Sequence, residues 1–115
     1  MSISRNYYVI AGYDLTGFAT DKFEDWKWDD GEEYFSYQTK GRIQLFDDPM
    51  NGDYLYLGYV LANLDMYEAE TVKINLNEID RQELYVRNKL NQLINDDIIT
   101  LNDYKYEVIV FEECT

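Results

Sequence analysis

The chain has 115 residues, of which 46 % are hydrophobic and 17 % aromatic, and this composition predicts one folded domain over residues 1–115 rather than a disordered acidic tail. Its net charge of −13 at pH 7 argues against binding to DNA, RNA or an anionic membrane and favours a basic partner. Histidine is absent, which excludes Ser-His and Cys-His nucleophile pairs and ordinary zinc sites, and the one cysteine, Cys114, excludes a disulfide within the chain.

The first expected element is a strand over residues 6–13. Its β-branched and aromatic residues occur on both faces, which is typical of an interior strand. Gly12 within it indicates either a bulge or a place where another backbone comes close. A turn is expected over residues 14–17.

Residues 20–30 fit two structures. In a helix, Thr20 would be the N-cap residue, and Asp21, Asp25 and Asp29 would lie on one face because they are four residues apart. In a strand, the same three carboxylates would again share a face. A short helix, ended by the glycine that follows it, is the preferred interpretation.

A β-hairpin is predicted over residues 41–62. Residues 33–47 fit a strand that is broken near residues 39–41, and residues 54–62 form the strongest strand pattern of the chain, apolar on both faces. The connection over residues 47–53 contains a proline that starts a turn and an Asn-Gly pair that tolerates positive φ.

A short half-buried strand is expected over residues 72–76, followed by a helix near residues 77–94. Asn75 and Glu78 fit a capping box at the start of this helix. One apolar stripe would pack the helix against the rest of the fold, and it comprises Ile79, Val86, Leu90, Leu93 and Ile94.

A last strand is expected over residues 104–112. The order of elements predicts an α+β fold in one domain. In this fold, an antiparallel sheet of about five strands carries one long amphipathic helix on one face, and a short acidic helical or loop insert follows the first strand.

The most unusual stretch is residues 21–33, where carboxylates are interleaved with both tryptophans of the chain. A core segment does not tolerate so many unpaired charges, and an acidic linker has no use for two tryptophans. The combination favours a surface that meets a partner, whereas the simpler interpretation is a solvated face over a small satellite core. The residues predicted to bind a partner belong to this stretch and to the hairpin turn: Asp21, Glu24, Asp25, Trp26, Trp28, Asp29, Asp30, Glu32, Glu33, Asp47, Asp48 and Asp53.

Two metal-dependent patterns can be found in the chain, and neither is favoured. Asp14 followed by Asp25-x-Lys27 resembles the acidic spacing of Mg²⁺-dependent nucleases, but 23 acidic residues produce so short a pattern by chance, and the net charge opposes DNA binding. Residues 47–53 resemble a calcium loop, but Pro49 and Gly58 stand where an EF-hand needs oxygen ligands. We therefore expect no catalytic residue, no metal site, no cofactor and no enzymatic activity.

The leading functional hypothesis rests on small size, strong acidity and abundant Tyr and Trp. In these features the chain is similar to the DNA-mimic proteins of phages and mobile elements: anti-CRISPR, anti-restriction and glycosylase-inhibitor proteins. The resemblance is one of composition and size, and no motif transfers residues from a particular family. It implies an inhibitor of a host defence or DNA-processing protein, such as a CRISPR nuclease or a restriction enzyme, that presents carboxylates where DNA phosphates would lie.

The alternative is an adaptor or accessory protein that docks through a tyrosine-rich sheet, because the twelve tyrosines supply large rings with a polar edge. The simpler interpretation, favoured over an aromatic ligand cage, is that these rings fill a wide, half-solvated sheet: Tyr7, Tyr54, Tyr56, Tyr59 and Tyr106. The expected partner is the basic surface of a nucleic-acid-binding protein and not nucleic acid or a membrane, and the chain is expected to be a monomer or homodimer. With no long apolar run, it is expected to be cytoplasmic, in the host cytoplasm if a phage encodes it.

Overall fold

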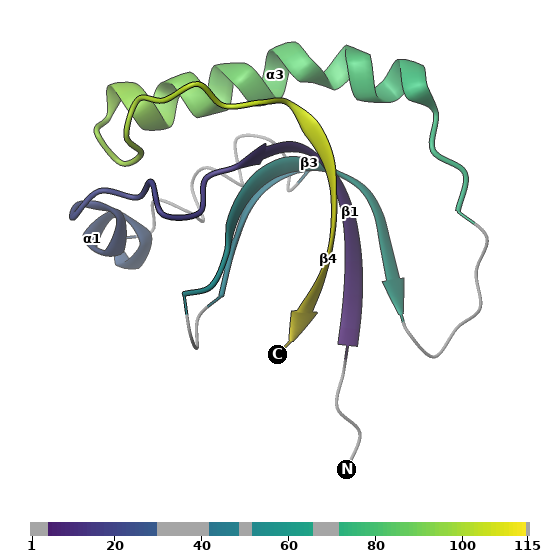
Figure 1. Cartoon of the computed structure of the whole chain (residues 1–115), viewed down its shortest axis with the longest axis horizontal. Helices are drawn as coiled ribbons and strands as arrows, with labels where there is room; N and C mark the ends of the chain where they lie inside the picture. The colour runs from purple at the N-terminus through teal and green to yellow at the C-terminus, as the bar shows by residue number, and fades with distance from the viewer. Residues whose placement is uncertain (1–4, 30–41, 49–51, 66–71, 115) are drawn as a thin grey trace.

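The computed structural model describes residues 5–29, 42–48, 52–65 and 72–114. The elements in chain order are β1 (Arg5–Asp14), α1 (Phe23–Trp28), β2 (Ile43–Asp47), β3 (Leu55–Asp65), α3 (Leu76–Asn95) and β4 (Glu107–Cys114). The strands form an antiparallel sheet in the order β2-β3-β1-β4, and α3 lies across one of its faces (Figure 1). The α+β architecture expected from the sequence is confirmed, with four strands rather than five in the described part of the chain.

The predicted strand over residues 72–76 is wrong. Residues 72–75 have no strand structure, and Leu76 is already the first residue of α3. The N-cap residue of α3 is Asn75, whose side chain accepts a 2.9 Å hydrogen bond from the Asn77 N–H. The alternation of apolar residues ends at this cap, and only Ile74 among them is half-buried, since Val72 and Leu76 are exposed. Three alternating apolar residues are a weak strand signal, and the N-cap residue of the following helix is the stronger signal here.

The other strands lie close to their predicted places. β1 is interior, as expected, because it pairs with β3 on one side and β4 on the other. The predicted hairpin is confirmed by the antiparallel pairing of β2 with β3, from Ile43 opposite Tyr59 to Asp47 opposite Leu55. The first part of the strand predicted over residues 33–47, up to residue 41, lies outside the described residues. β4 begins at Glu107 and runs to Cys114, so it is shifted toward the C-terminus relative to the prediction of 104–112.

The helix predicted near residues 77–94 is α3, which is one residue longer at each end. Its stripe faces the sheet: Val86, Leu90 and Leu93 are 0 %, 5 % and 2 % exposed. Ile79 and Ile94, at the two ends of the stripe, are half-buried. The period of the apolar residues therefore predicted both the helix and the side of it that packs.

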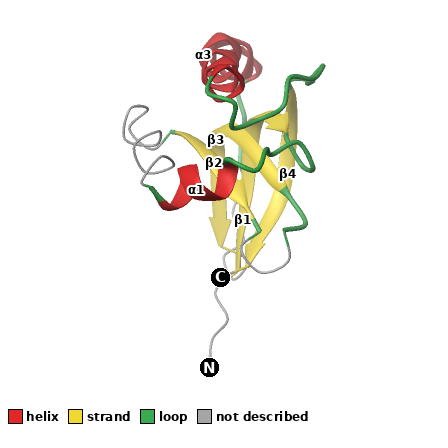
Figure 2. Ribbon diagram, turned by 90° about the vertical axis from the view of Figure 1, so that its left-hand side faces the viewer, coloured by secondary structure: helices red, strands yellow, loops and turns green. Residues whose placement is uncertain are grey.

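The sheet is arched in the view of Figure 1, with α3 over the outside of the arch, and Figure 2 shows the helix above the strands from the side. Because side chains alternate along a strand, neighbouring residues enter opposite faces. The outer face and α3 enclose the main core: Tyr13, Leu15, Phe23, Ile43, Leu45, Leu55, Leu57, Val86, Leu90, Leu93, Ile98 and Ile99. The inner face has a smaller cluster of Ile10, Phe46 and Phe111, against which Tyr8, Tyr54, Tyr56, Val60 and Ile109 pack.

Gly12 of β1 faces Gly58 of β3 in the register of the sheet. A Cβ atom added to Gly12 would lie 1.8 Å from the Leu57 carbonyl oxygen, so the two backbones come close at this residue. The register shift between the strands occurs earlier, between Val9 and Ile10. Of the two predicted roles of Gly12, close backbone approach is therefore the one that holds at this position.

Tyr106 connects the chain before β4 to α3. Its hydroxyl donates a 2.5 Å hydrogen bond to the Ile79 carbonyl, and its ring lies 5.6 Å from that of Tyr13. Burial, with the Glu83 carboxylate nearby, raises the pKa of Tyr106 to about 12. The phenol therefore remains a hydrogen-bond donor throughout the neutral pH range.

Candidate functional site

The short helix α1 contains the centre of the acidic stretch, and a loop distant in sequence determines its position. The predicted N-cap residue, Thr20, is not the cap, since Lys22 occupies that place without a side-chain capping bond. The Thr20 hydroxyl instead donates a 2.6 Å hydrogen bond to the Asp97 carbonyl and accepts one of 3.2 Å from the Lys22 N–H. The Thr20 N–H also donates to the Ile98 carbonyl at 2.9 Å. The segment after α3 thus fixes the chain entering α1.

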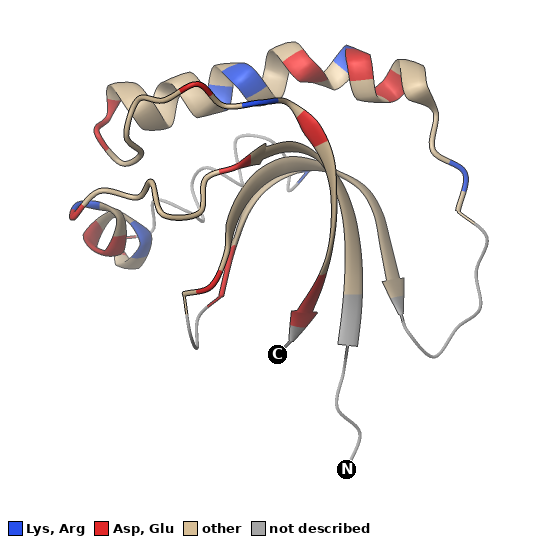
Figure 3. Cartoon of the chain, in the orientation of Figure 1, with Lys and Arg blue, Asp and Glu red and all other residues tan. Residues whose placement is uncertain are grey.

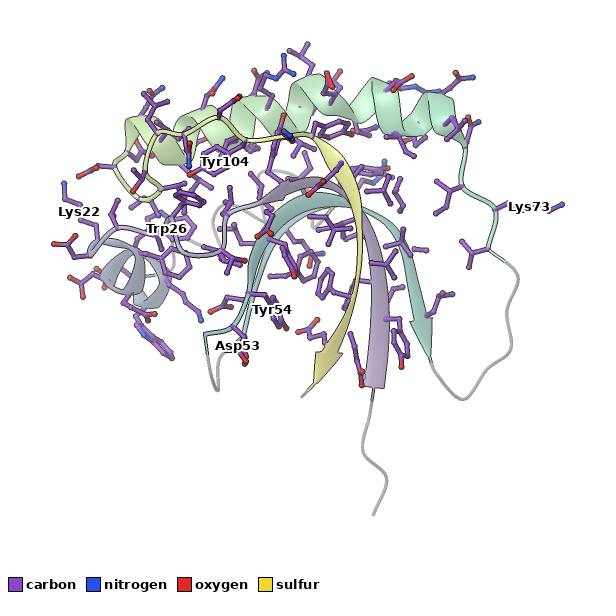
Figure 4. The ribbon with its side chains drawn as sticks, in the orientation of Figure 1. Lys22, Trp26, Asp53, Tyr54, Lys73 and Tyr104 are labelled. Atoms are coloured by element: carbon purple, nitrogen blue, oxygen red, sulfur yellow. The ribbon has the colours of Figure 1, made fainter. Side chains whose placement is uncertain are left out.

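The two tryptophans of α1 have different environments. Trp26 is half-buried and packs against the main core, with its ring 6.0 Å from that of the buried Phe23. In Figure 4, Trp26 lies on the inner side of α1, whereas Lys22 points outward. Trp28 is 76 % exposed, and the Lys27 Nζ atom lies 5.8 Å from the centre of its ring. Trp28 is therefore the tryptophan that can reach a partner, and Trp26 is mainly a core residue.

The acidic residues predicted around α1 are at the surface wherever the structure describes them. Asp21, Glu24, Asp25 and Asp29 are all exposed. Asp21 precedes the helix and Asp29 is its C-cap residue, so the helix is shorter than the acidic row predicted for it. Asp30, Glu32 and Glu33 lie outside the described residues.

The hairpin carboxylates have structural contacts as well as charge. Asp47 ends β2, and its carboxylate bonds the Lys27 ammonium. Asp48 shapes the turn, since its carboxylate accepts a 3.3 Å hydrogen bond from the Asp53 N–H and its carbonyl accepts one of 3.1 Å from the Gly52 N–H. Gly52 has φ +70°, as the predicted turn requires, while Pro49 and Asn51 lie outside the described residues. Asp53 is exposed at the end of the hairpin (Figure 4).

The fold brings the two acidic segments together. Glu24 of α1 and Asp47 and Asp48 of the hairpin line one hollow of about 260 Å³. The ion pair between Lys27 and Asp47 joins the two elements, with both side chains about one-fifth exposed, at 18 % and 22 %. We call this part of the molecule the acidic end, and it consists of Asp21, Glu24, Asp25, Asp29, Asp47, Asp48 and Asp53.

Positive charge at the acidic end is already paired. Lys27 bonds Asp47, and Lys22 lies 3.1 Å from the Asp97 carboxylate beyond α3. Figure 3 shows Asp and Glu on α1, at the end of α3 nearest to it and at the hairpin turn, with lysines also present at α1. The carboxylates that remain exposed therefore give this end a negative potential that a basic surface would neutralise.

The inner face of the sheet contains a second feature, a set of aromatic rings in mutual contact. Phe111 of β4 lies at its centre, with ring centroids 5.7 Å from Tyr8, 5.2 Å from Phe46, 5.5 Å from Tyr54 and 4.9 Å from Tyr56. We call these five residues the aromatic face. No helix among the described residues covers it, and Tyr54 points into the arch in Figure 4.

The structure divides the tyrosines that the sequence grouped together. Tyr54 and Tyr56 belong to the aromatic face, whereas Tyr59 and Tyr106 pack against the main core. Burial, with Asp14 nearby, raises the pKa of Tyr56 above its usual value. The Tyr56 phenol therefore stays neutral near pH 7 and adds no charge to the aromatic face.

Glu113 should make stability depend on pH. Burial, and then repulsion from Asp47, raises its pKa above the usual 4.5, so the folded state binds this proton more tightly than the unfolded state does. The stabilisation from the protonated carboxyl is complete below pH 4.5 and is lost as the pH rises through the raised pKa. We expect Glu113→Gln to raise the melting temperature at pH 7, the gain to shrink as the pH falls through the raised pKa, and no gain to remain below pH 4.5.

The matched control for Glu113→Gln is Glu107→Gln, which removes the same charge from an exposed position of the same strand. It measures the general relief of charge repulsion in a chain of net charge −13. Equal gains for the two variants across the pH range would show that the environment of Glu113 has no special effect.

No protein-family model, curated protein or solved structure matches this chain. None of the helices described is long and apolar enough to cross a membrane. Over the same residues, no three His, Cys, Asp or Glu side chains form a group that could hold a metal ion. Lys27, which the nuclease-like spacing would need to orient water, bonds Asp47. The acidic end and the aromatic face correspond to the two kinds of docking surface that the sequence predicted.

Proposed function

We propose that this protein is a small acidic inhibitor that docks its acidic end on the basic surface of a nucleic-acid-binding protein, in place of DNA phosphates. The observation that supports this most directly is the hollow in which Glu24 meets Asp47 and Asp48. Acidic residues from two separate parts of the chain form one surface there. The targets of such a mimic would be proteins such as CRISPR nucleases and restriction enzymes, and its source a phage or another mobile element.

The physical basis of this proposal is that carboxylates on a fixed scaffold can replace phosphates. DNA-binding proteins neutralise phosphates with Lys and Arg, and DNA presents one charge per about 1.7 Å of its axis. α1 is anchored by the buried Phe23, by the half-buried Trp26 and by the ion pair of Lys27 with Asp47. The carboxylates near it therefore lose less conformational entropy on binding than those of a flexible tail would.

Charge and aromatic contact should have separate roles in such an interface. Long-range attraction mainly raises the association rate and depends on salt. The exposed ring of Trp28, beside the carboxylates of α1, can supply short-range contact area, because aromatic side chains contribute much of the energy at interface centres.

The test is displacement of DNA from a panel of purified CRISPR nucleases and restriction enzymes, measured by fluorescence anisotropy of a labelled duplex at two salt concentrations. We expect the parent protein to displace DNA from at least one of them, and to do so less well at high salt. The variant carries Glu24→Gln, Asp25→Asn and Asp53→Asn, all at exposed positions. Exposed charge pairs contribute about 0.5 kcal/mol each, so the loss of three carboxylates should lower its affinity about tenfold at low salt.

The control variant carries Asp80→Asn, Asp103→Asn and Glu107→Gln, which remove the same charge from exposed positions away from the acidic end. It should bind nearly as the parent does. Both variants should melt at or slightly above the parental temperature, because self-repulsion decreases. If no protein of the panel releases DNA, or if the two variants weaken binding equally, the mimicry proposal is wrong.

A second candidate function is an adaptor that docks through the aromatic face. It is supported by five rings in mutual contact on a sheet face over which no described helix lies. Binding of this kind should change little with salt and should survive the acidic substitutions. Tyr54→Ala, at a half-buried position of the face, should then weaken binding more than the triple acidic variant does.

A further inference from the structure

A groove beside α3 has the opposite charge from most of the surface. It lies between α3 and the β2–β3 side of the sheet and has a volume of about 600 Å³. Arg42, Arg81 and Lys89 line it, and no Asp or Glu is among the described residues that do. The chain contains 10 Lys and Arg against 23 Asp and Glu, so three cations along one groove form a local reversal of charge.

One wall of the groove is formed by residues of α3 that are evenly spaced along the helix. Arg81, Tyr85 and Lys89 are four residues apart, so their side chains lie in one row along α3, with the tyrosine between two cations. The opposite wall is formed by Arg42, just before β2, and by the half-buried Tyr59 of β3. Tyr85 is 57 % exposed, so packing in the core does not account for this ring.

The two arginines are available to a ligand. Arg42 is exposed and makes no ion pair within 4 Å to any residue that the structure describes. Arg81 pairs with Glu78 at 3.0 Å, but its side chain remains 63 % exposed. An exposed pair of this kind contributes little to stability, so the guanidinium can turn to a stronger anion.

We propose that this groove binds a mononucleotide, with its phosphate at Arg42 and Arg81 and its base against Tyr85. Guanidinium groups match phosphate oxygens with two parallel hydrogen bonds, and Lys89 adds a further positive charge. Tyrosine rings stack on nucleobases. The Gln82 amide nitrogen donates a 3.0 Å hydrogen bond to the Glu78 carboxylate, so its amide oxygen is the group that can accept from a base edge in the groove. The volume lies in the usual range of small-molecule sites, about 300–1,000 Å³.

The size of the ligand is limited by the charge of the whole protein. At physiological salt, charges are screened beyond about 8 Å, so the acidic surface does not prevent a small anion from reaching the groove. A nucleic acid strand would extend over that acidic surface and be repelled along its length. Binding of a mononucleotide in this groove does not depend on the docking function proposed for the acidic end.

The experiment is isothermal titration of the full chain with AMP, with adenosine and with inorganic phosphate. We expect AMP to bind with a Kd on the order of 10–100 µM, and each of the other two to bind at least about tenfold more weakly, because each lacks half of the contacts. AMP should also raise the melting temperature. No heat and no change in melting with AMP at millimolar concentration would overturn the proposal.

Variants locate the site. Arg42→Gln and Arg81→Gln should each weaken AMP binding about tenfold, as the loss of a charged hydrogen-bond partner does. Tyr85→Leu should bring the Kd for AMP close to that for phosphate. The control is Arg87→Gln, which removes a cation of the same helix that pairs with Glu83 at 3.3 Å and does not line the groove. It should leave the Kd unchanged.

Three other outcomes contradict the proposal. An equal loss in Arg87→Gln would mean that only net charge matters. Equal affinity for phosphate and AMP would mean a plain anion site without base recognition. Tighter binding of a ten-nucleotide single strand, lost in Arg42→Gln, would mean that the ligand is a nucleic acid strand rather than a mononucleotide.

Discussion

Replacing Gly12 by alanine should largely unfold the protein. The added Cβ would lie 1.8 Å from the Leu57 carbonyl oxygen and 2.5 Å from the Gly58 Cα atom, distances that folded proteins do not show. Both neighbours are backbone atoms, so no side-chain rotation can relieve the clash, and β1 would have to move away from β3. Since β1 is interior and contains the fully buried Ile10 and Ala11, we expect a loss of at least about 3 kcal/mol, the upper range for overpacking.

The measurement is urea unfolding followed by circular dichroism, with two other glycines as controls. A Cβ at Gly58 would lie 2.8 Å from the Ile10 Cδ1, 3.0 Å from the Ile10 Cβ and 3.1 Å from the Ala11 carbonyl oxygen. Only the Cδ1 can rotate away, but the other two contacts are much longer than those at Gly12, so Gly58→Ala should cost less than Gly12→Ala. Gly17 has open space around it but φ +84°, so Gly17→Ala should cost about 1 kcal/mol through backbone strain alone. If Gly12→Ala is as stable as Gly17→Ala, the close approach of β1 and β3 is not real.

Sequence patterns predicted those parts of the fold that are determined by interactions between residues close together in the chain. The apolar period of α3 indicated both the helix and its buried side, and the turn residues around Gly52 indicated the hairpin, because each signal reports a structure built within about 20 residues. The strand predicted over residues 72–76 was wrong, although it too was a local prediction. Its short alternation of apolar residues was a weaker signal than Asn75, the N-cap residue of α3.

The acidic end and the groove beside α3 both depend on contacts between residues far apart in the sequence, which no local pattern shows. The acidity and exposure of the α1 stretch could be predicted from its composition, but not its place beside the hairpin turn, which rests on Lys27 reaching Asp47 and on Thr20 reaching Asp97. The groove beside α3 was missed for the same reason. The row of Arg81, Tyr85 and Lys89 was visible as a spacing of four residues, but only the folded sheet brings Arg42 opposite to it.

The other large effect is expected from Leu90→Ala. Leu90 is 5 % exposed, with Val86 and Leu93 buried one turn before and after it on α3. Removing its side chain leaves a cavity that α3 and the strands beneath cannot fill without moving, and such cavities cost about 2–5 kcal/mol. This would be a large part of the stability of a small domain, typically about 5–15 kcal/mol.

The matched control is Leu84→Ala, the same substitution on the same helix at a position that is 61 % exposed. Alanine has a slightly higher helix propensity than leucine, and little apolar area is lost there, so the free energy of unfolding should change by no more than about 0.5 kcal/mol. Urea unfolding of both variants measures the difference between them. If Leu90→Ala lowers the free energy of unfolding as little as Leu84→Ala does, the apolar stripe of α3 does not pack on the sheet. In that case the groove between α3 and the β2–β3 side of the sheet would also be wrong.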